Sequence, residues 1–237
     1  MFDKLAQDFY DNFIYKDRWL YIVDGLKVTL IVTFFAVLIG ITIGFLIAMV
    51  RVTDKKAIKN PFLRVIFIIL DFLCKVYLTV IRGTPVVIQL MIIYFVIFGS
   101  SRVDKTFVAV IAFGINSGAY VAEIIRSGIM SIDKGQFEAG RSLGFNYIQT
   151  MRYIIMPQAV KNVLPALGNE FIVLLKETSV AGYIALQDLT KGGDIIRSQT
   201  YSAFMPLIAV AVIYLVMVMI FSYLVGRLER RLNDDRR

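Results

Sequence analysis

The stretch VTLIVTFFAVLIGITIGFLIAMV, from Val28 to Val50, decides the fold class of this chain. It runs for 23 residues without a charged side chain. As a helix rising about 1.5 Å per residue, it is long enough to cross a hydrocarbon core of roughly 30 Å. The whole chain is similarly apolar, with 58% hydrophobic residues among 237 and a mean hydropathy of +0.70. This composition excludes an ordinary soluble domain and predicts an all-α membrane protein.

The charge and the reactive residues exclude several classes of function. The net charge of +8 does not point to nucleic acid, because the bases cluster beside apolar runs, where Lys and Arg orient membrane segments. Cys74 is the only cysteine and the chain has no histidine, so a disulfide within the chain and the usual zinc or haem ligand sets are missing. We therefore expect no metal or other cofactor on this chain.

Two groups of five bases set the predicted orientation through the positive-inside rule. The first group follows the apolar run quoted above: Arg51, Lys55, Lys56, Lys59 and Arg64. The second group follows the apolar run 106–125: Arg126, Lys134, Arg141, Arg152 and Lys161. Both groups are predicted to be cytoplasmic, which places the amino terminus outside. The apolar run 106–125 crosses the membrane once before the second group, so an odd number of crossings is required between Arg64 and Arg102.

Five membrane spans follow from this orientation. The stretch 61–98 is predicted to be one broken span, kinked around the RGTP sequence at Arg82–Pro85. The last span, Phe204–Gly226, ends beside a group of arginines that places the carboxyl terminus in the cytoplasm. The fourth span, from about residue 160 to residue 186, is predicted to be interrupted at four positions: Pro165, Gly168, Asn169 and Glu170.

The first 19 residues are predicted to form a segment of their own, ahead of a transmembrane domain over residues 20–237. They lack the basic start of a cleaved signal peptide, so we expect them to stay attached. Four apolar residues fall on one helical face, which predicts an amphipathic helix along the membrane surface: Phe2, Leu5, Phe9 and Phe13.

A hydrophilic segment at about 131–159 separates the third and fourth spans. Asp133 and Asn146 are each followed three residues later by glutamine, as in a helix N-cap, and Gly144 stands where a C-cap needs a left-handed residue. The segment therefore predicts a helix, a sharp turn and a second helix. Apolar residues recur at near-helical spacing and leave Arg141 and Arg152 for a wetter surface: Phe137, Gly140, Leu143, Ile148, Met151 and Ile155.

This segment resembles the EAA signature of ABC importer permeases, in which the loop is the coupling helix that docks into the ATP-hydrolysing subunit. The chain departs from the usual pattern at Gly140, where Ala is common, and at Met156, where Leu is common. Both departures are small changes in volume. The resemblance implies a role in coupling to the ATPase for seven residues: Glu138, Ala139, Gly140, Arg141, Gly144, Ile154 and Pro157.

Further motifs look like the polar amino acid branch of that family, which includes permeases for histidine, glutamine and arginine. They are RGTP followed by Gln89, AYVAEIIRSGI at 119–129, MPQA at 156–159 and KETSV at 176–180. The resemblance implies a type I importer permease in the bacterial cytoplasmic membrane. It also implies two ABC ATPase subunits, a second copy or a similar permease, an extracytoplasmic solute-binding protein and a polar amino acid substrate.

Nothing in the sequence points to an enzyme. The chain has no G-x-x-x-x-G-K-[ST] loop, so ATP and its Mg²⁺ are expected on the partner ATPase. An intramembrane hydrolase is disfavoured because no histidine is present to activate a serine. A stand-alone channel or ion-coupled amino acid carrier is the alternative, and it would transport without ATP.

Polar residues inside the predicted spans are the candidates for a substrate pathway, because a charge at bilayer depth costs about 2.5–3.5 kcal/mol. Four acids against three bases lie in or beside the spans, which weakly favours a cationic amino acid. Hydrogen bonding between helices is the competing explanation. The candidates are Asn116, Ser117, Tyr120, Glu123, Asn169, Glu170, Arg82 and Gln89.

The first span also contains Gly40 and Gly44 in the spacing GxxxG. This spacing lets two helices approach closely, either within one chain or between two copies.

Overall fold

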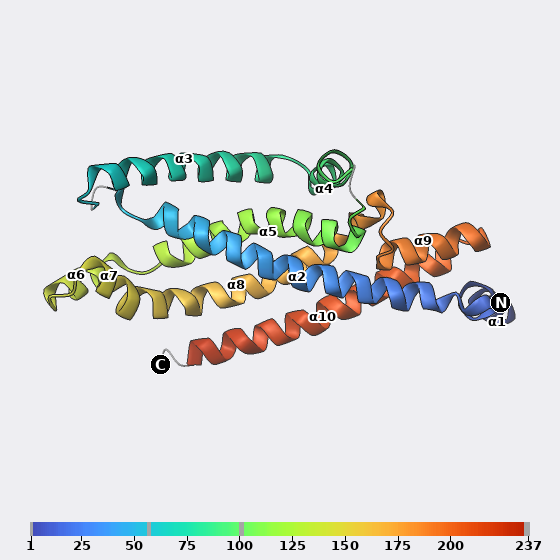
Figure 1. Ribbon diagram of the computed structural model, residues 1–237. Helices are drawn as coiled ribbons and strands as arrows, with labels where there is room; N and C mark the ends of the chain where they lie inside the picture. The colour runs from blue at the N-terminus through green and yellow to red at the C-terminus, as the bar shows by residue number, and fades with distance from the viewer. Residues whose placement is uncertain (1, 56–57, 100–101, 235–237) are drawn as a thin grey trace. The chain divides into compact units, whose positions relative to one another are not determined.

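The computed structural model describes residues 2–55, 58–99 and 102–234, and all the regular structure in these ranges is helical (Figure 1). Lys56, Arg236 and Arg237, which were counted among the orienting bases, lie outside the described residues. The five longest helices are α2 Trp19–Val52, α3 Pro61–Gly83, α5 Lys105–Met130, α8 Met156–Glu177 and α10 Phe204–Asp234.

Three of these helices are long and apolar enough to cross a membrane: Trp19–Val52, Lys105–Met130 and Phe204–Leu232. The first and last are longer than the apolar runs that predicted them, because helical structure continues into the polar flanks. Such extensions are typical of spans whose ends reach past the hydrocarbon core.

Shorter helices connect the long ones. They are α1 Phe2–Phe9, α4 Val86–Met91, α6 Lys134–Ser142, α7 Tyr147–Thr150 and α9 Leu189–Thr200. Wider π-helical turns occupy Tyr10–Ile14, Ile92–Ile97 and Met151–Ile155, and tighter 3₁₀ turns occupy Tyr15–Asp17 and Thr178–Ile184. Helix α9 was not predicted, and it lies in the stretch between the predicted fourth span and the predicted last span.

The chain divides into two compact units. One contains the chain up to residue 37, residues 85–114 and residues 171–222. The other contains residues 38–84 and 115–170 and the chain from residue 223 onward. We call them the first and the second unit; α2, α5, α8 and α10 each contribute to both.

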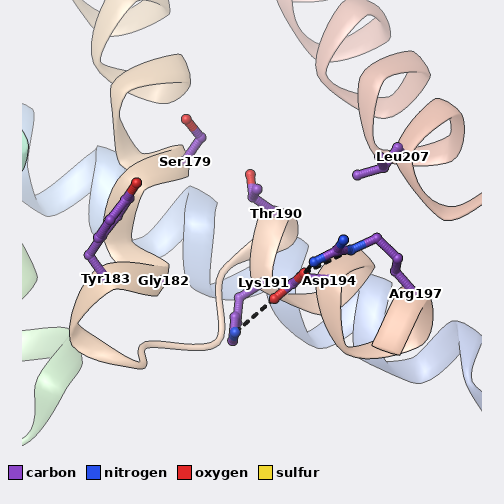
Figure 2. Close-up of a pocket in the computed structure, with 8 residues that line it drawn as sticks. All are labelled: Ser179, Gly182, Tyr183, Thr190, Lys191, Asp194, Arg197 and Leu207. Carbon is purple, nitrogen blue, oxygen red and sulfur yellow. Dashed lines mark hydrogen bonds and ion pairs between the residues drawn. The ribbon is translucent and has the colours of Figure 1, made fainter. Parts of the chain in front are cut away.

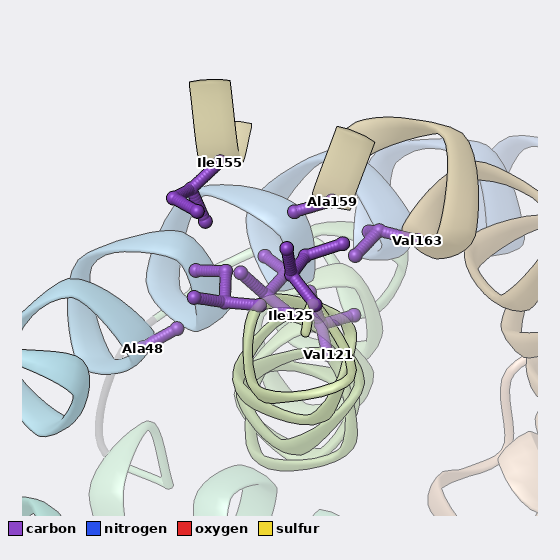
Figure 3. Packing of buried hydrophobic residues seen from close by; sticks show 8 residues of the cluster. Ala48, Val121, Ile125, Ile155, Ala159 and Val163 are labelled. Carbon is purple, nitrogen blue, oxygen red and sulfur yellow. The ribbon is translucent and has the colours of Figure 1, made fainter. Parts of the chain in front are cut away.

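Close approach between α2 and α5 organises the second unit. A Cβ on Gly44 would lie 2.6 Å from Cγ1 of Val121, and a Cβ on Gly40 would lie 2.8 Å from Oγ of Ser117. Only glycine fits there, so GxxxG serves packing within the chain. Beside this contact, aliphatic side chains from α2, α5, α8 and the end of the hairpin segment before α8 form a buried cluster. It includes Ala48, Val121, Ile125, Ile155, Ala159 and Val163 (Figure 3).

In the first unit, α9 packs directly on α2. A Cβ on Gly192 would lie 2.3 Å from the carbonyl oxygen of Tyr21, and the backbone N–H of Leu189 donates to Oγ1 of Thr29 at 3.1 Å. The core of this unit joins the amino-terminal segment, α2, α8, α9 and α10 through Phe13, Ile22, Leu175, Leu189, Ile196, Val210 and Met217.

The predicted break at RGTP is confirmed. Helix α3 ends at Gly83, Thr84 and Pro85 have extended backbone conformations, and α4 begins at Val86. Proline disfavours the helical region for the residue before it, which accounts for the end of α3.

The predicted interruption of the fourth span is wrong, because α8 runs without a break through Pro165, Gly168, Asn169 and Glu170. One proline removes only one backbone donor, and a helix packed on both sides can carry that loss. Gly168 serves packing instead, since its Cβ would lie 2.6 Å from Cγ2 of Val225 on α10.

The amino-terminal segment is fastened to α9 by polar contacts. Oγ1 of Thr200 donates to Oδ1 of Asn12 at 2.9 Å, and Nε of Arg18 donates to Oε1 of Gln199 at 3.2 Å. Of the predicted apolar face, Phe13 is buried and Phe9 is exposed. The side chains of Phe2 and Leu5 lie outside the described residues, so the amphipathic helix remains a prediction.

Asp188 caps α9 and supplies a test of this arrangement. Its side chain is buried and accepts from the N–H groups of Thr190 and Lys191 at 3.1 and 3.0 Å. We expect Asp188→Ala to lower the stability of the chain by about 0.5–2 kcal/mol, because two backbone donors lose their acceptor. The melting temperature in detergent measures this loss.

Asp188→Asn is the matched control, because asparagine caps helices equally well. Burial raises the pKa of the Asp188 carboxyl above its ordinary value of 3.8. Ionisation therefore costs the folded state free energy, and this contribution to stability falls as the pH rises from the unfolded-state pKa through the raised one. Asp188→Asn should melt no lower than the parent at neutral pH. A melting temperature as low as that of Asp188→Ala would contradict the capping role.

Candidate functional site

The segment between α5 and α8 folds as the predicted helical hairpin. Asp133 caps α6, with Oδ1 accepting from the N–H of Gly135 at 2.7 Å. The expected partner Gln136 does not complete this cap. Its Oε1 instead accepts from Nε2 of Gln158 at 3.2 Å, which ties α6 to the start of α8.

The turn between α6 and α7 is closed by two backbone hydrogen bonds. The N–H of Phe145 donates to the carbonyl of Gly140 at 3.0 Å, and the N–H of Gly144 donates to that of Arg141 at 2.9 Å. This pair of bonds is the Schellman arrangement, and Gly144 stands at its left-handed position with φ of +81°. The predicted C-cap is confirmed.

The second helix of the hairpin begins with the predicted capping box. The N–H of Gln149 donates to Oδ1 of Asn146, and the N–H of Asn146 donates to Oε1 of Gln149, both at 2.9 Å. These local bonds satisfy backbone donors at the start of α7. Hydrogen bonds between residues close in the sequence therefore determine the fold of the hairpin.

One face of the hairpin packs inward. Phe137, Met151 and Ile154 contact the buried cluster of the second unit, and Ile155 belongs to it. Gly140 is buried against Thr150, whose side chain is 2% exposed. These contacts attach the hairpin to α5 and α8, so a force on the hairpin acts on both long helices.

The other face is open. Leu143 and Ile148, which were predicted to share the inner apolar face, are 72% and 75% exposed because they flank the turn and point away from the cluster. Of the residues expected to couple to the ATPase, Gly140 is buried and Ile154 is half-buried. The remaining five are exposed: Glu138, Ala139, Arg141, Gly144 and Pro157.

The contact of Gly140 with Thr150 explains why this chain has glycine where alanine is usual. A Cβ at position 140 would lie 2.6 Å from Cγ2 of Thr150. We expect Gly140→Ala to destabilise the hairpin by about 1–3 kcal/mol through overpacking. Melting of the purified chain, with hydrogen exchange of the hairpin, measures the effect.

Thr150→Ala provides the control for this prediction. Among the described residues none bonds the buried Oγ1 of Thr150, so its removal should cost less than about 1 kcal/mol. The same change removes both Thr150 atoms that a Cβ at position 140 would meet. The double variant should therefore be more stable than Gly140→Ala alone, and additive losses would contradict the proposed contact.

The polar residues of the third span do not share one environment. Asn116 and Ser117 are buried, and Oγ of Ser117 donates to Oε1 of Glu170 on α8 at 2.8 Å. Glu170 is 8% exposed. The structure thus supports the interhelical explanation for Ser117 and Glu170, in which a buried carboxylate is stabilised by hydrogen bonding.

Tyr120 and Glu123 lie further along α5 and are only partly buried. The guanidinium of Arg82 lies 5.6 Å from the centre of the Tyr120 ring, a cation–π distance. Two nitrogens of Arg126 donate to the Glu123 carboxylate, at 3.1 and 2.5 Å. Glu123 also interacts electrostatically with Arg82 and Arg51.

Arg82 borders a cavity of about 430 Å³ in the second unit, which is lined by Arg51, Lys75, Leu78, Thr79, Arg82 and Gly83. Asp71 neutralises part of this basic surface through Lys75 at 2.9 Å and Lys55 at 3.2 Å. Lys75 lies four residues after Asp71 on the same helix, whereas Lys55 and Arg51 reach Asp71 from outside α3. A spacing rule within one helix finds only the first of these contacts.

The last two candidates lie apart from this group. Gln89 is buried on α4 in the first unit. Asn169 is exposed on α8 in the second unit. The structure therefore brings together Arg82, Tyr120 and Glu123, and separately Ser117 and Glu170.

A further cavity of about 370 Å³ lies in the first unit, between the turn after α8, α9 and the start of α10, and polar residues make up most of its lining (Figure 2). Lys191 and Arg197 both bond Asp194, and these hydrogen bonds hold the pKa of its carboxyl below the ordinary value. Tyr183 and Ser179 face them across the cavity. This group could not be predicted from the sequence, because no sequence pattern predicted α9.

Two transport permeases are similar to this chain over most of its length. The chain is 38% identical over 215 residues to the glutamine transport system permease protein GlnP of Escherichia coli, covering 90% of this chain and 93% of that one. It is 37% identical over 217 residues to the arginine transport system permease protein ArtQ of Bacillus subtilis, covering 91% and 94%.

A crystal structure of an amino acid ABC transporter with histidines matches with a TM-score of 0.81 and 44% identity, over 92% of this chain and 98% of that chain. The family model described as binding-protein-dependent transport system inner membrane component matches residues 40–234. This chain belongs to the family of inner membrane components of binding-protein-dependent transport systems.

Proposed function

We propose that this chain is the membrane-spanning permease subunit of an ATP-driven importer of polar amino acids. The observation that carries the proposal is the self-capped hairpin at 133–155, whose inner face is packed on α5 and α8 and whose outer face exposes Leu143 and Ile148. Relatives that carry glutamine and arginine in their names support the substrate class.

The hairpin gives a physical route from ATP hydrolysis to the membrane helices. Two apolar side chains beside a rigid turn suit a cleft in a partner protein, where their burial is favourable. A partner that moves between two states shifts the permease only through contacts that differ between those states. The packing of Phe137, Met151 and Ile154 would pass that shift to the long helices.

The proposed assembly contains two ABC ATPase subunits, a second copy of this chain or a similar permease, and an extracytoplasmic solute-binding protein. In this assembly α2, α3, α5, α8 and α10 are the five spans, with the amino terminus outside. Alternating access then moves the substrate past the second unit without covalent chemistry. The amphipathic segment over residues 1–19 lies at the membrane surface.

The substrate pathway is proposed to pass Arg82, Tyr120 and Glu123. Their side chains are partly or fully exposed within one unit and combine a guanidinium, an aromatic ring and a carboxylate. A zwitterionic amino acid needs partners of both charges, and a cationic one needs the carboxylate most. Three other residues remain candidates: Asn116, Asn169 and Gln89. Ser117 and Glu170 are weaker candidates, because the hydroxyl of one already donates a hydrogen bond to the carboxylate of the other.

Reconstitution distinguishes this proposal from a stand-alone channel or carrier. Vesicles would hold the chain with the ATPase and binding protein encoded by neighbouring genes, and radiolabelled glutamine, arginine and histidine would be offered. We expect uptake only when ATP and all three components are present. Uptake by the chain alone, with no ATPase supplied, would overturn the proposal.

A further inference from the structure

An apolar groove of about 280 Å³ lies in the first unit, between the amino-terminal segment, α2 and α10. Phe13 and Ile14 form one wall, Trp19 and Ile22 the second, and Ala209 and Ile213 the third. No polar atom contributes to its surface. A cavity of this kind does not hold water and favours a hydrocarbon occupant.

The groove is held open by polar contacts behind it. The Asn12–Thr200 and Arg18–Gln199 hydrogen bonds fasten the amino-terminal segment to α9 on either side of Phe13 and Ile14. Since these bonds involve none of the lining side chains, the wall is in place before anything binds. A preformed site loses little entropy on binding.

The position of the groove points to the membrane. Two of its walls come from α2 and α10, which are long and apolar enough to span a bilayer, so the groove continues the surface that these helices present to lipid. Trp19 lines the groove, Tyr10 and Tyr15 belong to the amino-terminal segment that forms one of its walls, and all three side chains are about half exposed. Tyrosine and tryptophan gather at the membrane–water interface, where one side of the ring is apolar and the other wet.

We infer that this groove binds one acyl chain of a membrane phospholipid. Its volume matches roughly nine methylene groups, if each takes about the 30 Å³ of a water molecule. The bound chain would seal the amino-terminal segment against α10 and make the first unit sensitive to lipid composition.

Trp19 makes the inference testable, because it is the only tryptophan in the chain and lines the groove. The full chain would be reconstituted in phosphatidylcholine vesicles containing lipid brominated at carbons 6 and 7 of one chain, and tryptophan fluorescence would be recorded. We expect strong quenching in the parent. Ala209→Phe fills the groove from α10 and should reduce that quenching about twofold or more, since bromine must reach the ring.

Ala211→Phe is the matched control, because it makes the same change at an exposed position of α10 outside the groove. It should leave the quenching unchanged. Ala209→Leu, a smaller filling, serves if Ala209→Phe fails to fold. Native mass spectrometry should find one phospholipid retained by the parent and the control, and lost from the filled variant.

Two outcomes would overturn the inference. Equal quenching in the parent and the filled variants would mean that Trp19 meets only lipid at the general membrane surface. Protection of Trp19 from all brominated lipid, relieved when copies dissociate in detergent, would assign the groove to a second copy. Neither result bears on ATP-dependent uptake, so the inference can fail while the proposed function stands.

Discussion

Gly144→Val should reduce ATP-driven uptake at least about tenfold, because the turn between α6 and α7 needs a left-handed residue. Gly144 has φ of +81°, and within the described part of the chain no atom beyond its two neighbours in sequence lies within 4 Å of the place where a Cβ would stand. The cost is therefore conformational. A left-handed conformation costs roughly 1–2 kcal/mol for an ordinary residue, and 1.4 kcal/mol corresponds to a factor of ten.

Gly144→Val should uncouple transport from ATP hydrolysis without preventing assembly. The inner face of the hairpin is held by Met151, Ile154 and Ile155, none of which depends on the turn, so the chain should still assemble in the membrane. We expect the complex to hydrolyse ATP while its stimulation by substrate and binding protein disappears. Parallel assays of uptake and ATP hydrolysis in vesicles measure both.

Gly144→Asn is the control for this prediction, since asparagine tolerates the left-handed region. It should keep most of the uptake. If valine transported as well as the parent, the closed turn would have no part in coupling. If both variants lost uptake equally, the flexibility of glycine would matter more than its left-handed conformation.

The hairpin could be predicted closely because its shape is local. Each device lies within six residues of its partner: the Asp133 cap, the glycine turn and the Asn146–Gln149 box. Local hydrogen bonds of this kind have sequence signatures. What the sequence could not show was the division of apolar residues between inside and outside, which depends on where α5 and α8 lie.

Features that depend on distant residues were missed. Pro165 and Gly168 suggested a broken helix, yet the glycine serves contact with Val225, nearly sixty residues away. The spacing of Gly40 and Gly44 allowed both packing within the chain and dimerisation, and the contacts with Ser117 and Val121 show that it serves packing within the chain. Helix α9 was not predicted because few of its residues are buried. The residues that anchor it lie on α2, far away in the sequence.

The same limit applied to the substrate pathway. Eight polar residues were chosen for lying in the spans, and helical spacing could not separate those that bond another helix from those that face open space. The Ser117–Glu170 bond joins residues 53 positions apart, which no periodicity reveals. The cavity beside Arg82 adds Arg51 and Thr79, neither of which was a candidate for the substrate pathway.

Glu123→Gln should change substrate preference, with arginine uptake falling about tenfold relative to glutamine uptake. The Glu123 carboxylate is partly exposed and shares its charge with Arg126, within electrostatic reach of Arg82. Glutamine keeps the size of the side chain and can still accept from Arg126, but it removes the negative charge that a cationic substrate would meet. A tenfold change corresponds to about 1.4 kcal/mol, within the range of a charge-assisted hydrogen bond.

Glu170→Gln is the matched control, because it makes the same change at the buried acid that Ser117 bonds. If Glu170 holds α5 to α8 and does not meet substrate, its variant should melt at a lower temperature while the arginine-to-glutamine ratio stays that of the parent. Competition between the two labelled amino acids in one vesicle preparation gives the ratio independently of how much complex assembles. If Glu123→Gln lowered the uptake of arginine and of glutamine equally, Glu123 would have a structural role. If Glu170→Gln changed the arginine-to-glutamine ratio, Glu170 would have to be part of the substrate pathway.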